Sequence, residues 1–357
     1  MFFNKFWNAG GIGRRAAYAV AGGLAVLCLG GCGGGGEKTQ DAMLMIQNLD
    51  YEGALERLEG AEGEGENLRL INRARGIAYM GLTDYDQAAY FFEQALAGSD
   101  GLVQSMDFDL NFYLAAAYTK NGRYAEAEEI YNAILGLRPE EKDAYFLRGN
   151  ARMALGDHTG AREDFDKVIT MDPGDYDRLI EVYEVLDFYG FGEEGRTYLR
   201  AALESGGKQM DKYVIGRIYY YLGDYQNAYI ALEEAKEKGG ARSYLYLGRA
   251  YEATGDYNYA VNVYNSYLNK NEGNAEMYNQ LGLCEMTRGE YQSALNAFQA
   301  GMQLKDASMM QTLSFNEIVA YEHLGDFRQA LVLMENYLKN YPDDNQAKRE
   351  YQFLSTR

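Results

Sequence analysis

Hydrophobic positions in this chain recur with a period of about 34 residues. Apolar residues stand eleven, eight and four positions before a recurring glycine, which is the spacing of one helix face. An alanine stands five positions after the glycine, and a large apolar residue nine positions after it. The pattern predicts two amphipathic helices per period, joined where the glycine takes the left-handed conformation that ends a helix. The recurring glycines are Gly122, Gly156, Gly190, Gly223, Gly255, Gly289 and Gly325.

Residues on both sides of this turn repeat as well. The stretches "YLGDYQNA" (221–228) and "ATGDYNYA" (253–260) share Gly-Asp-Tyr and the alanine, 32 residues apart. An Asp after the glycine is placed to cap the second helix, and the alanine lets a neighbouring helix approach closely. The chain's three prolines share one phase of the period, because each follows a turn glycine by 17 residues. They are Pro139, Pro173 and Pro342.

This order of small, aromatic, alanine, aromatic and proline positions resembles the signature of the tetratricopeptide repeat family, over about residues 41–342 and in nine copies. The resemblance implies an all-α fold, an α-solenoid of about nine helical hairpins in a right-handed superhelix. One hairpin cannot bury its apolar face alone, so neighbouring hairpins must stack. In this family the first helices of successive hairpins line a concave groove, where extended peptides lie. The resemblance therefore implies a protein or peptide partner.

Two copies depart from the pattern. An insertion at Ala97–Gly101 stretches the spacing between the second and third copies to 39 residues. The fifth copy, "FYGFGEEG" (188–195), has Gly192 in place of the turn aromatic and Gly195 in place of the alanine. It is either a hinge between two halves of the superhelix or a decayed repeat held by its neighbours. After the last proline, residues 343–357 predict a closing helix that caps the final repeat.

The N-terminal 36 residues differ from the repeats. Three basic residues precede an apolar run at 16–29, which is too short and too rich in glycine for a membrane span of about 20 residues but suits a signal peptide. The run ends in Leu29-Gly30-Gly31-Cys32, which resembles the bacterial lipobox, whose cysteine is lipidated and becomes the mature N-terminus. Cys28 is a poor rival because bulky Leu27 precedes it.

The lipobox-like motif sets the expected organisation and location. We expect a signal peptide at 1–31, a lipidated Cys32 with a glycine-rich tether at 32–40, and the repeats at 41–342. The resemblance implies a lipid anchor on the extracytoplasmic face of a bacterial membrane, either the cell membrane or an outer membrane. An uncleaved signal anchor is the alternative.

The acidic composition narrows the function classes. The formal net charge is −19, and removal of the three basic residues with the signal would make it −22. Such a surface argues against nucleic acid, which is bound by Lys and Arg at phosphates. His158 and His323 are the only histidines, and processing would leave Cys284 as the only free thiol. No nucleophile with a base and no metal set is recognisable, so we expect no enzyme activity, metal, cofactor or small-molecule substrate.

Candidate binding residues stand near three, six, ten and thirteen positions before the turn glycines, on the helix face expected to line the groove. Arginine grips carboxylates, and tyrosine offers a ring and a hydroxyl. Alternatively, the arginines pair with local acids such as Glu184 and Glu252 and only hold the superhelix together. The family's known carboxylate clamp is not matched, because Phe146 stands where its lysine belongs, although Asn150 is in phase. The candidates are Tyr213, Arg217, Tyr220, Arg242, Tyr246, Arg249 and Asn279.

Three functional hypotheses follow from these features. The first is a lipid-anchored scaffold that binds a protein or peptide in its concave groove. The second is a structural subunit of an envelope assembly, such as secretion, pilus or wall machinery, with contacts on its convex face and ends. The third, an enzyme accessory or solute-capturing lipoprotein, is the weakest, because an open solenoid rarely encloses a small-molecule pocket.

Overall fold

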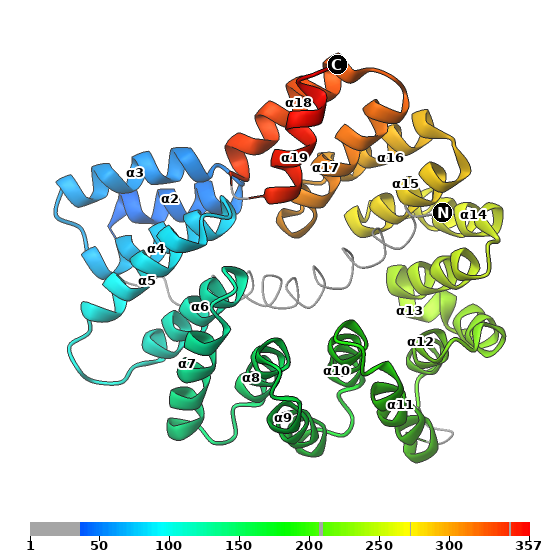
Figure 1. Cartoon of the computed structure of the whole chain (residues 1–357), viewed down its shortest axis with the longest axis horizontal. Helices are drawn as coiled ribbons and strands as arrows, with labels where there is room; N and C mark the ends of the chain where they lie inside the picture. Colours follow the sequence, from blue (N-terminus) through cyan, green and yellow to red (C-terminus); the bar gives the residue numbers. More distant parts are fainter. Residues whose placement is uncertain (1–35, 207–209, 272, 343) are drawn as a thin grey trace. The chain divides into compact units, whose positions relative to one another are not determined.

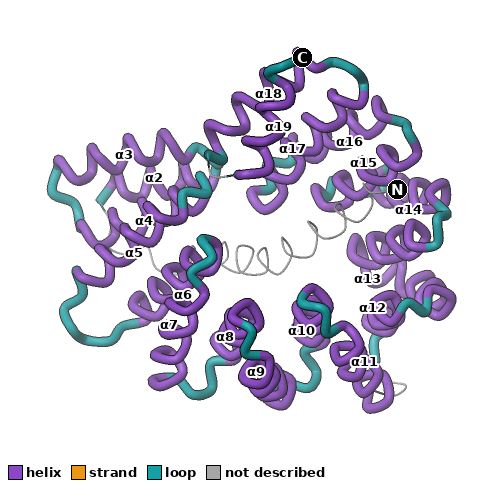
Figure 2. Tube along the Cα trace, in the orientation of Figure 1, coloured by secondary structure: helices purple, strands orange, loops and turns teal. Residues whose placement is uncertain are grey.

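The computed structural model describes residues 36–206, 210–271, 273–342 and 344–357, and all regular elements in these residues are helices (Figure 2). The described chain forms two compact units, where the sequence predicts one continuous array of repeats. Unit 1 consists of the described residues up to Gly195 with residues 340–342. Unit 2 consists of the described residues of Arg196–Lys339 and Asp344–Arg357.

Unit 1 is a series of helices joined by short turns (Figure 1). They are α2 (Glu37–Gln47), α3 (Tyr51–Gly63), α4 (Leu68–Gly81), α5 (Tyr85–Ala97), α6 (Ser105–Lys120), α7 (Tyr124–Leu137), α8 (Lys142–Leu155), α9 (His158–Met171) and α10 (Tyr176–Phe188). Helix α11 (Gly192–Gly206) contains the boundary between the units.

Unit 2 continues the same alternation of helices and turns. Its helices are α12 (Lys212–Leu222), α13 (Tyr225–Ala253), α14 (Tyr257–Leu268), α15 (Ala275–Arg288), α16 (Tyr291–Gln303), α17 (Ala307–His323), α18 (Phe327–Asn340) and α19 (Asn345–Leu354). Helix α13 is two helices in one, because Gly240 breaks it with φ 57° and ψ −148°. With α13 divided there, the described helices form nine successive hairpins, from α2–α3 to α17–α18, followed by α19. The predicted all-α solenoid of nine hairpins is thus confirmed.

The turns of the hairpins have the predicted geometry. All seven recurring glycines have φ between 75° and 88°. Leu49 and Thr83 occupy the same turn position in the two copies that lack a glycine, and they too have positive φ, 66° and 61°. Asp157, Asp224 and Asp326 follow turn glycines, and the carboxylate of each accepts a hydrogen bond from a backbone N–H in the first turn of the next helix.

The repeated alanines and large apolar residues form the core between helices. Ala127, Ala228 and Ala294 are fully buried, like their counterparts in the other copies. The large residue nine positions after the turn glycine packs over a glycine on the first helix of its hairpin. A Cβ at Gly282 would lie 2.3 Å from the ring of Phe298, and one at Gly149 would lie 2.6 Å from that of Phe165. The repeated glycine on the first helix is therefore a packing requirement.

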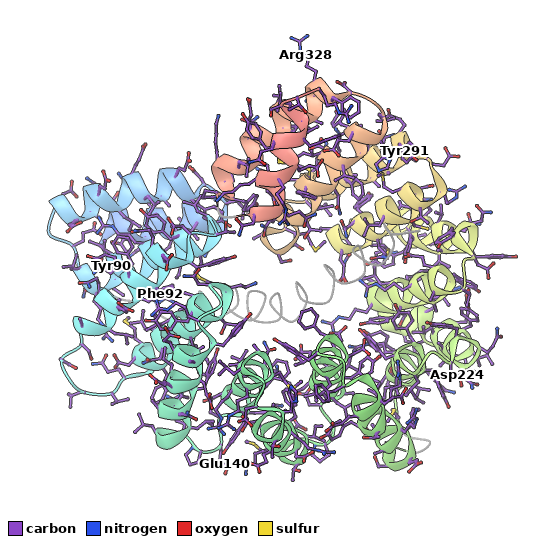
Figure 3. The ribbon with its side chains drawn as sticks, in the orientation of Figure 1. Tyr90, Phe92, Glu140, Asp224, Tyr291 and Arg328 are labelled. Carbon is purple, nitrogen blue, oxygen red and sulfur yellow. The ribbon has the colours of Figure 1, made fainter. Side chains whose placement is uncertain are left out.

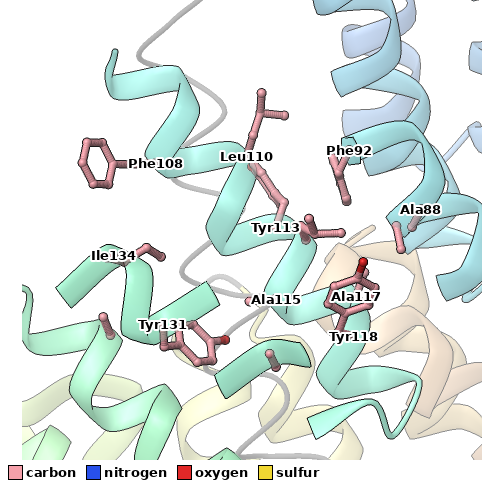
Figure 4. Close-up of a cluster of buried hydrophobic side chains, with 14 of the residues drawn as sticks. Ala88, Phe92, Phe108, Leu110, Tyr113, Ala115, Ala117, Tyr118, Tyr131 and Ile134 are labelled. Carbon is pink, nitrogen blue, oxygen red and sulfur yellow. The ribbon is translucent and has the colours of Figure 1, made fainter. Parts of the chain in front are cut away.

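Aromatic stacking extends this core from one hairpin to the next. In unit 1 the ring of Phe92 on α5 stacks on that of Tyr113 on α6 with centroids 5.3 Å apart, and both are buried (Figure 4). Tyr90, two residues before Phe92, is 51% exposed (Figure 3). Helix α5 therefore turns one face to the core and the other to solvent.

The structure refines the expected boundaries. Helix α2 begins at Glu37, inside the segment 32–40 that the sequence assigns to a tether. The closing helix is α19, and Asp344 caps its start by accepting hydrogen bonds from the N–H groups of Gln346 and Ala347. The carboxylate of Asp344 also accepts a hydrogen bond from the hydroxyl of Tyr337 at 2.7 Å. Cys32 and the predicted signal peptide lie outside the described residues.

The unit boundary falls in the fifth copy, the one with the unusual glycines. Within unit 1, a Cβ at Gly195 would lie 2.9 Å from the ring of Tyr183 and 3.2 Å from its Cα. Close packing of α11 on α10, within the same hairpin, therefore explains Gly195. Whether the copy also acts as a hinge stays a hypothesis.

Candidate functional site

Five of the predicted binding residues form one cluster in unit 2, here called the tyrosine–arginine cluster: Tyr213, Arg217, Tyr220, Tyr246 and Arg249. The guanidinium carbon of Arg217 lies 5.1 Å from the ring centroid of Tyr213 and 5.0 Å from that of Tyr246. The guanidinium carbon of Arg249 lies 5.2 Å from the same Tyr246 ring. Tyr220 meets Tyr246 edge to face, with centroids 5.6 Å apart. Arginines from the sixth and seventh hairpins thus share one tyrosine ring, as the sequence predicts for a common face.

The local sequence places these side chains. Helix α12 starts at an N-cap, Asp211, whose carboxylate accepts a hydrogen bond from the N–H of Tyr213. Tyr213, Arg217 and Tyr220 follow at helical spacing, so they share one face of α12. The break at Gly240 ends the second helix of the sixth hairpin and starts the helix that carries Tyr246 and Arg249.

Both arginines of the cluster are buried, with 7% exposure for Arg217 and 5% for Arg249. A buried guanidinium needs charged or polar partners. Nη2 of Arg249 donates a hydrogen bond to Oε1 of Glu276, on α15, at 2.6 Å. Burial acts to lower the pKa of Arg249, but Glu276 and the surrounding tyrosines outweigh it and raise the pKa well above its ordinary value. Arg249 therefore keeps its positive charge.

This ion pair concerns the alternative role of the arginines, in which they pair with local acids and only hold the superhelix together. Arg249 pairs with a local acid, but the acid is Glu276 and not Glu252. Glu252 instead accepts hydrogen bonds from the hydroxyl of Tyr264 and from Nε2 of Gln280. The side chain of Glu276 is 46% exposed, so the pair lies at the edge of the cluster and not deep in the core.

The other two predicted residues lie outside the cluster. Arg242 is exposed on α13, unlike the two buried arginines. Asn279 is buried on α15, where its Oδ1 accepts a hydrogen bond from Nδ2 of Asn316 on α17 at 2.8 Å.

Sequence reasoning missed three participants. Glu276 stands thirteen positions before Gly289, so the rule that found the other candidates also selects it. Tyr221 adds a hydroxyl contact of 2.9 Å to the hydroxyl of Tyr246. Asn316 lies on α17, nine positions before Gly325, and only the folded chain brings it to Asn279.

Other chemistry-bearing residues are accounted for by packing. The thiol of Cys284 is buried, and burial raises its pKa to about 12. The ring of His158 packs against Phe191 and that of His323 against Tyr291. Within the described residues, no three His, Cys, Asp or Glu side chains are grouped as a metal site would need. No helix in the same residues combines the length and hydropathy needed to cross a bilayer.

Comparison with known proteins addresses the family directly. Three tetratricopeptide repeat models match the chain, one at residues 73–141, 114–176 and 245–306, another at 315–344 and a third at 212–237. The chain belongs to the tetratricopeptide repeat family. Its repeats indicate a scaffold for protein–protein interaction, and this fold is generally non-enzymatic.

Individual relatives of this tetratricopeptide repeat protein are distant. RNA polymerase II-associated protein 3 of Xenopus tropicalis is 25% identical over 196 residues, which are 55% of this chain and 27% of that protein. The Mus musculus protein of the same name is 27% identical over 136 residues, 38% of this chain and 20% of that one. The matches thus span about a quarter or less of these relatives.

Solved structures with similar helical repeats are equally distant in sequence. A tetratricopeptide repeat protein from Parabacteroides merdae is 16% identical, with 81% of this chain and 98% of that chain covered and a TM-score of 0.42. A chain of the APC/C hetero-tetramer Cut9–Hcn1 is 15% identical, with 89% and 83% covered and a TM-score of 0.40.

Proposed function

We propose that this tetratricopeptide repeat protein holds an extended segment of a partner protein along the first helices of unit 2. The observation that supports this most is the shared ring of Tyr246, which brings the guanidinium groups of Arg217 and Arg249 together. The two arginines place two guanidinium groups on one face of a protein whose net charge is −19, and Glu276 pairs with one of them. A partner with a carboxylate, on an acidic side chain or at its C-terminus, fits them best.

Glu276 supports the same choice of ligand chemistry. Its carboxylate lies on Arg249 although nearly half of its side chain is exposed, so the cluster already binds a carboxylate at its edge. A partner carboxylate would compete with Glu276 for the same guanidinium, and its affinity would include the cost of that exchange. The tyrosine rings and hydroxyls would then contact the neighbouring atoms of the partner.

Replacement of both arginines tests the proposal. We expect Arg217→Ala with Arg249→Ala to lose most crosslinked partner in a pull-down from native membranes. The matched control is Arg328→Ala with Arg349→Ala, which removes the same charge from exposed positions; Arg328 projects away from the helices (Figure 3). Unchanged capture by the first variant would refute binding at the cluster.

A second candidate surface lies mainly on the second helices of unit 2. The rings of Tyr229, Tyr251 and Tyr259 form a continuous stack, with centroids 4.6 Å and 5.5 Å apart. Tyr259 is 62% exposed, and Ile230, which follows Tyr229 on α13, is 60% exposed. In a structural subunit of an envelope assembly, these exposed side chains would contact the neighbouring subunit. Ile230→Ser with Tyr259→Ser should then remove the captured partner while the double arginine variant keeps it.

We also propose that the protein is anchored by lipid at Cys32 on the extracytoplasmic face of a bacterial membrane, the cell membrane or an outer membrane. The support is the sequence of the first 32 residues, in which a basic and apolar leader ends in Leu-Gly-Gly-Cys. A lipid anchor would hold the partner-binding repeats close to the membrane surface.

A further inference from the structure

The insertion after the second hairpin forms an exposed apolar loop in unit 1. This α5–α6 loop consists of residues 98–104, and Figure 2 shows it in teal as a long connection between the two helices. Leu102 is 70% exposed and its neighbour Val103 is 64% exposed. Single exposed apolar residues are common on proteins, whereas exposed apolar residues that lie together mark a contact surface.

Hydrogen bonds hold the loop on both sides of the apolar pair. The N–H of Leu102 donates to Oδ1 of Asp100 at 3.0 Å. The N–H of Gln104 donates to Oδ2 of Asp107, in the first turn of α6, at 2.7 Å. Leu102 and Val103 therefore stand between two fixed points, and their exposure is a property of the folded loop.

Arg69, the second residue of α4, ties the loop to the start of that helix. Its Nε donates to the C=O of Ala95, in the last turn of α5, at 3.0 Å, and its guanidinium pairs with Asp107. Leu68, the first residue of α4, is exposed as well. The starts of α4 and α6 and the apolar loop thus lie at one edge of unit 1, here called the loop edge.

The start of α2 lies at the loop edge too. The carboxylate of Glu66, two residues before Leu68, accepts hydrogen bonds from the N–H groups of Lys38 and Thr39, both at 3.0 Å. It also accepts one from the hydroxyl of Thr39 at 2.6 Å. A carboxylate in this position suits the positive end of the helix dipole. Glu66 therefore holds the first turn of α2 beside the start of α4.

The proposed lipid anchor is close to the loop edge along the chain. Cys32 precedes Gly36, the N-cap of α2, by four residues. Four residues span at most about 14 Å when fully extended. A lipid on Cys32 would therefore keep the loop edge near the bilayer surface. Apolar groups at such a surface bury themselves about 5–10 Å into the boundary between headgroups and acyl chains, so the loop is within reach.

Ion pairs reduce the negative charge that the loop edge presents. Lys38 pairs with Glu64 at 2.6 Å, and Arg69 pairs with Asp107. Each pair cancels one negative charge beside the exposed apolar side chains. Repulsion by anionic headgroups should therefore be weaker at this edge than the net charge of −19 suggests.

We propose that Leu102 and Val103 insert into the surface of the membrane that carries the anchor, with the starts of α2, α4 and α6 turned toward the bilayer. This inference rests on the proposed lipidation of Cys32 and goes beyond it, because it states which edge of unit 1 faces the lipid. The covalent lipid holds the protein at the membrane, since two short side chains bury fewer carbons than one myristoyl chain, which itself binds only marginally. The loop sets the orientation.

A tryptophan in the loop tests this contact. The only tryptophan of the sequence, Trp7, lies in the predicted leader, so the processed protein has none of its own. Leu102→Trp is purified as the full processed chain and reconstituted into phosphatidylcholine vesicles, with either ordinary or brominated acyl chains. We expect the vesicles to shift its emission to shorter wavelength and the brominated lipid to quench it, because bromine quenches only an indole that it contacts.

Two further variants serve as controls. Leu155→Trp also replaces an exposed leucine in unit 1, at the far end of α8, about 20 Å along that helix from its first residue. Its emission should be the same in both kinds of vesicle. Adding Val103→Asp to Leu102→Trp should abolish the quenching, because a carboxylate beside the indole opposes entry into lipid. Circular dichroism checks that all three variants are folded.

Mass spectrometry of the same samples separates this inference from the proposed anchor. If Cys32 carries lipid but Leu102→Trp is neither shifted nor quenched, the inference is overturned and the anchor stands. The same conclusion follows if the emission shifts only when a soluble envelope extract is added, because the loop then contacts a protein. If Cys32 carries no lipid, the proposed anchor fails and the inference fails with it.

Discussion

At the scale of single residues, the repeat depends on a glycine that the large apolar residue covers. Gly282 shows this most sharply, because a Cβ there would lie 2.3 Å from the ring of Phe298, which is fully buried. We expect Gly282→Ala to lower the free energy of unfolding by about 1–3 kcal/mol through overpacking. Urea unfolding measures the change.

The control for this substitution is Gly136→Ala. Gly136 is an exposed helical position on α7, and a Cβ there would meet no atom within 4 Å. Alanine should therefore stabilise the protein, by about 0.5–1 kcal/mol from helix propensity alone. Equal effects of the two substitutions would show that contact with Phe298 is not the cause.

A second residue-scale prediction concerns the carboxyl of Glu322 on α17. Burial, helped by the charge of Glu350 on α19, raises the pKa of Glu322 to about 7. The folded state thus holds this proton more tightly than the unfolded chain, where Glu titrates near about 4.3. Its contribution to stability is complete below the unfolded pKa and is lost as pH rises through about 7.

Glu322→Gln should therefore match the wild type at pH 4 and exceed it in stability at pH 8. The expected gain is on the order of 1 kcal/mol, after allowance for solvent screening of the exposed part of the side chain. Urea midpoints across this pH range measure it, with exposed Glu290→Gln as the control. A difference between Glu322→Gln and the wild type that does not vary with pH would contradict the assignment.

At the scale of helices and turns, local sequence is sufficient for most of the fold. Glycine at the turn, aspartate as the cap and alanine at the close approach each have a local physical cause, so the hairpins could be predicted without coordinates. The partners that a side chain contacts on other helices could not be predicted in this way. The sequence places Arg249 on the correct face, but the choice of Glu276 over Glu252 depends on how α13 packs on α15. Asn316 was missed because its significance arises only from its distance to Asn279, 37 residues away.

The two turns without glycine give the prediction at this scale. Thr83 has φ 61°, which is unfavourable for a β-branched residue, and its buried hydroxyl has no hydrogen-bond partner among the described residues. We expect Thr83→Gly to stabilise the protein by roughly 1 kcal/mol, because it removes both costs. Gly325→Ala is the reciprocal variant: φ is 79° and the space around it is open, so a loss of similar size would come from the backbone alone. Denaturant midpoints of both variants measure these changes. A Thr83→Gly variant less stable than the wild type would show that Thr83 imposes no such cost.

At the scale of the whole molecule, the negative net charge bears on how the protein is held at a membrane. The only basic residues before Cys32 are Lys5, Arg14 and Arg15, and removal of this leader would change the net charge from −19 to −22. So acidic a surface is repelled by anionic lipid headgroups. Membrane association of the mature protein should therefore come from a covalent lipid and not from its surface.

Cys32→Ala tests this directly. A fatty-acid analogue should label the wild type and the Cys28→Ala control, but not Cys32→Ala, because lipidation requires the thiol at that position. Without the lipid, the acidic repeats have no attraction for the bilayer, so the variant should move from the membrane fraction to the soluble fraction or keep an uncleaved leader, which mass spectrometry distinguishes. A Cys32→Ala protein that is still labelled would place the acyl chain elsewhere. One that stays on the membrane unlabelled, with its leader attached, would favour the uncleaved signal anchor.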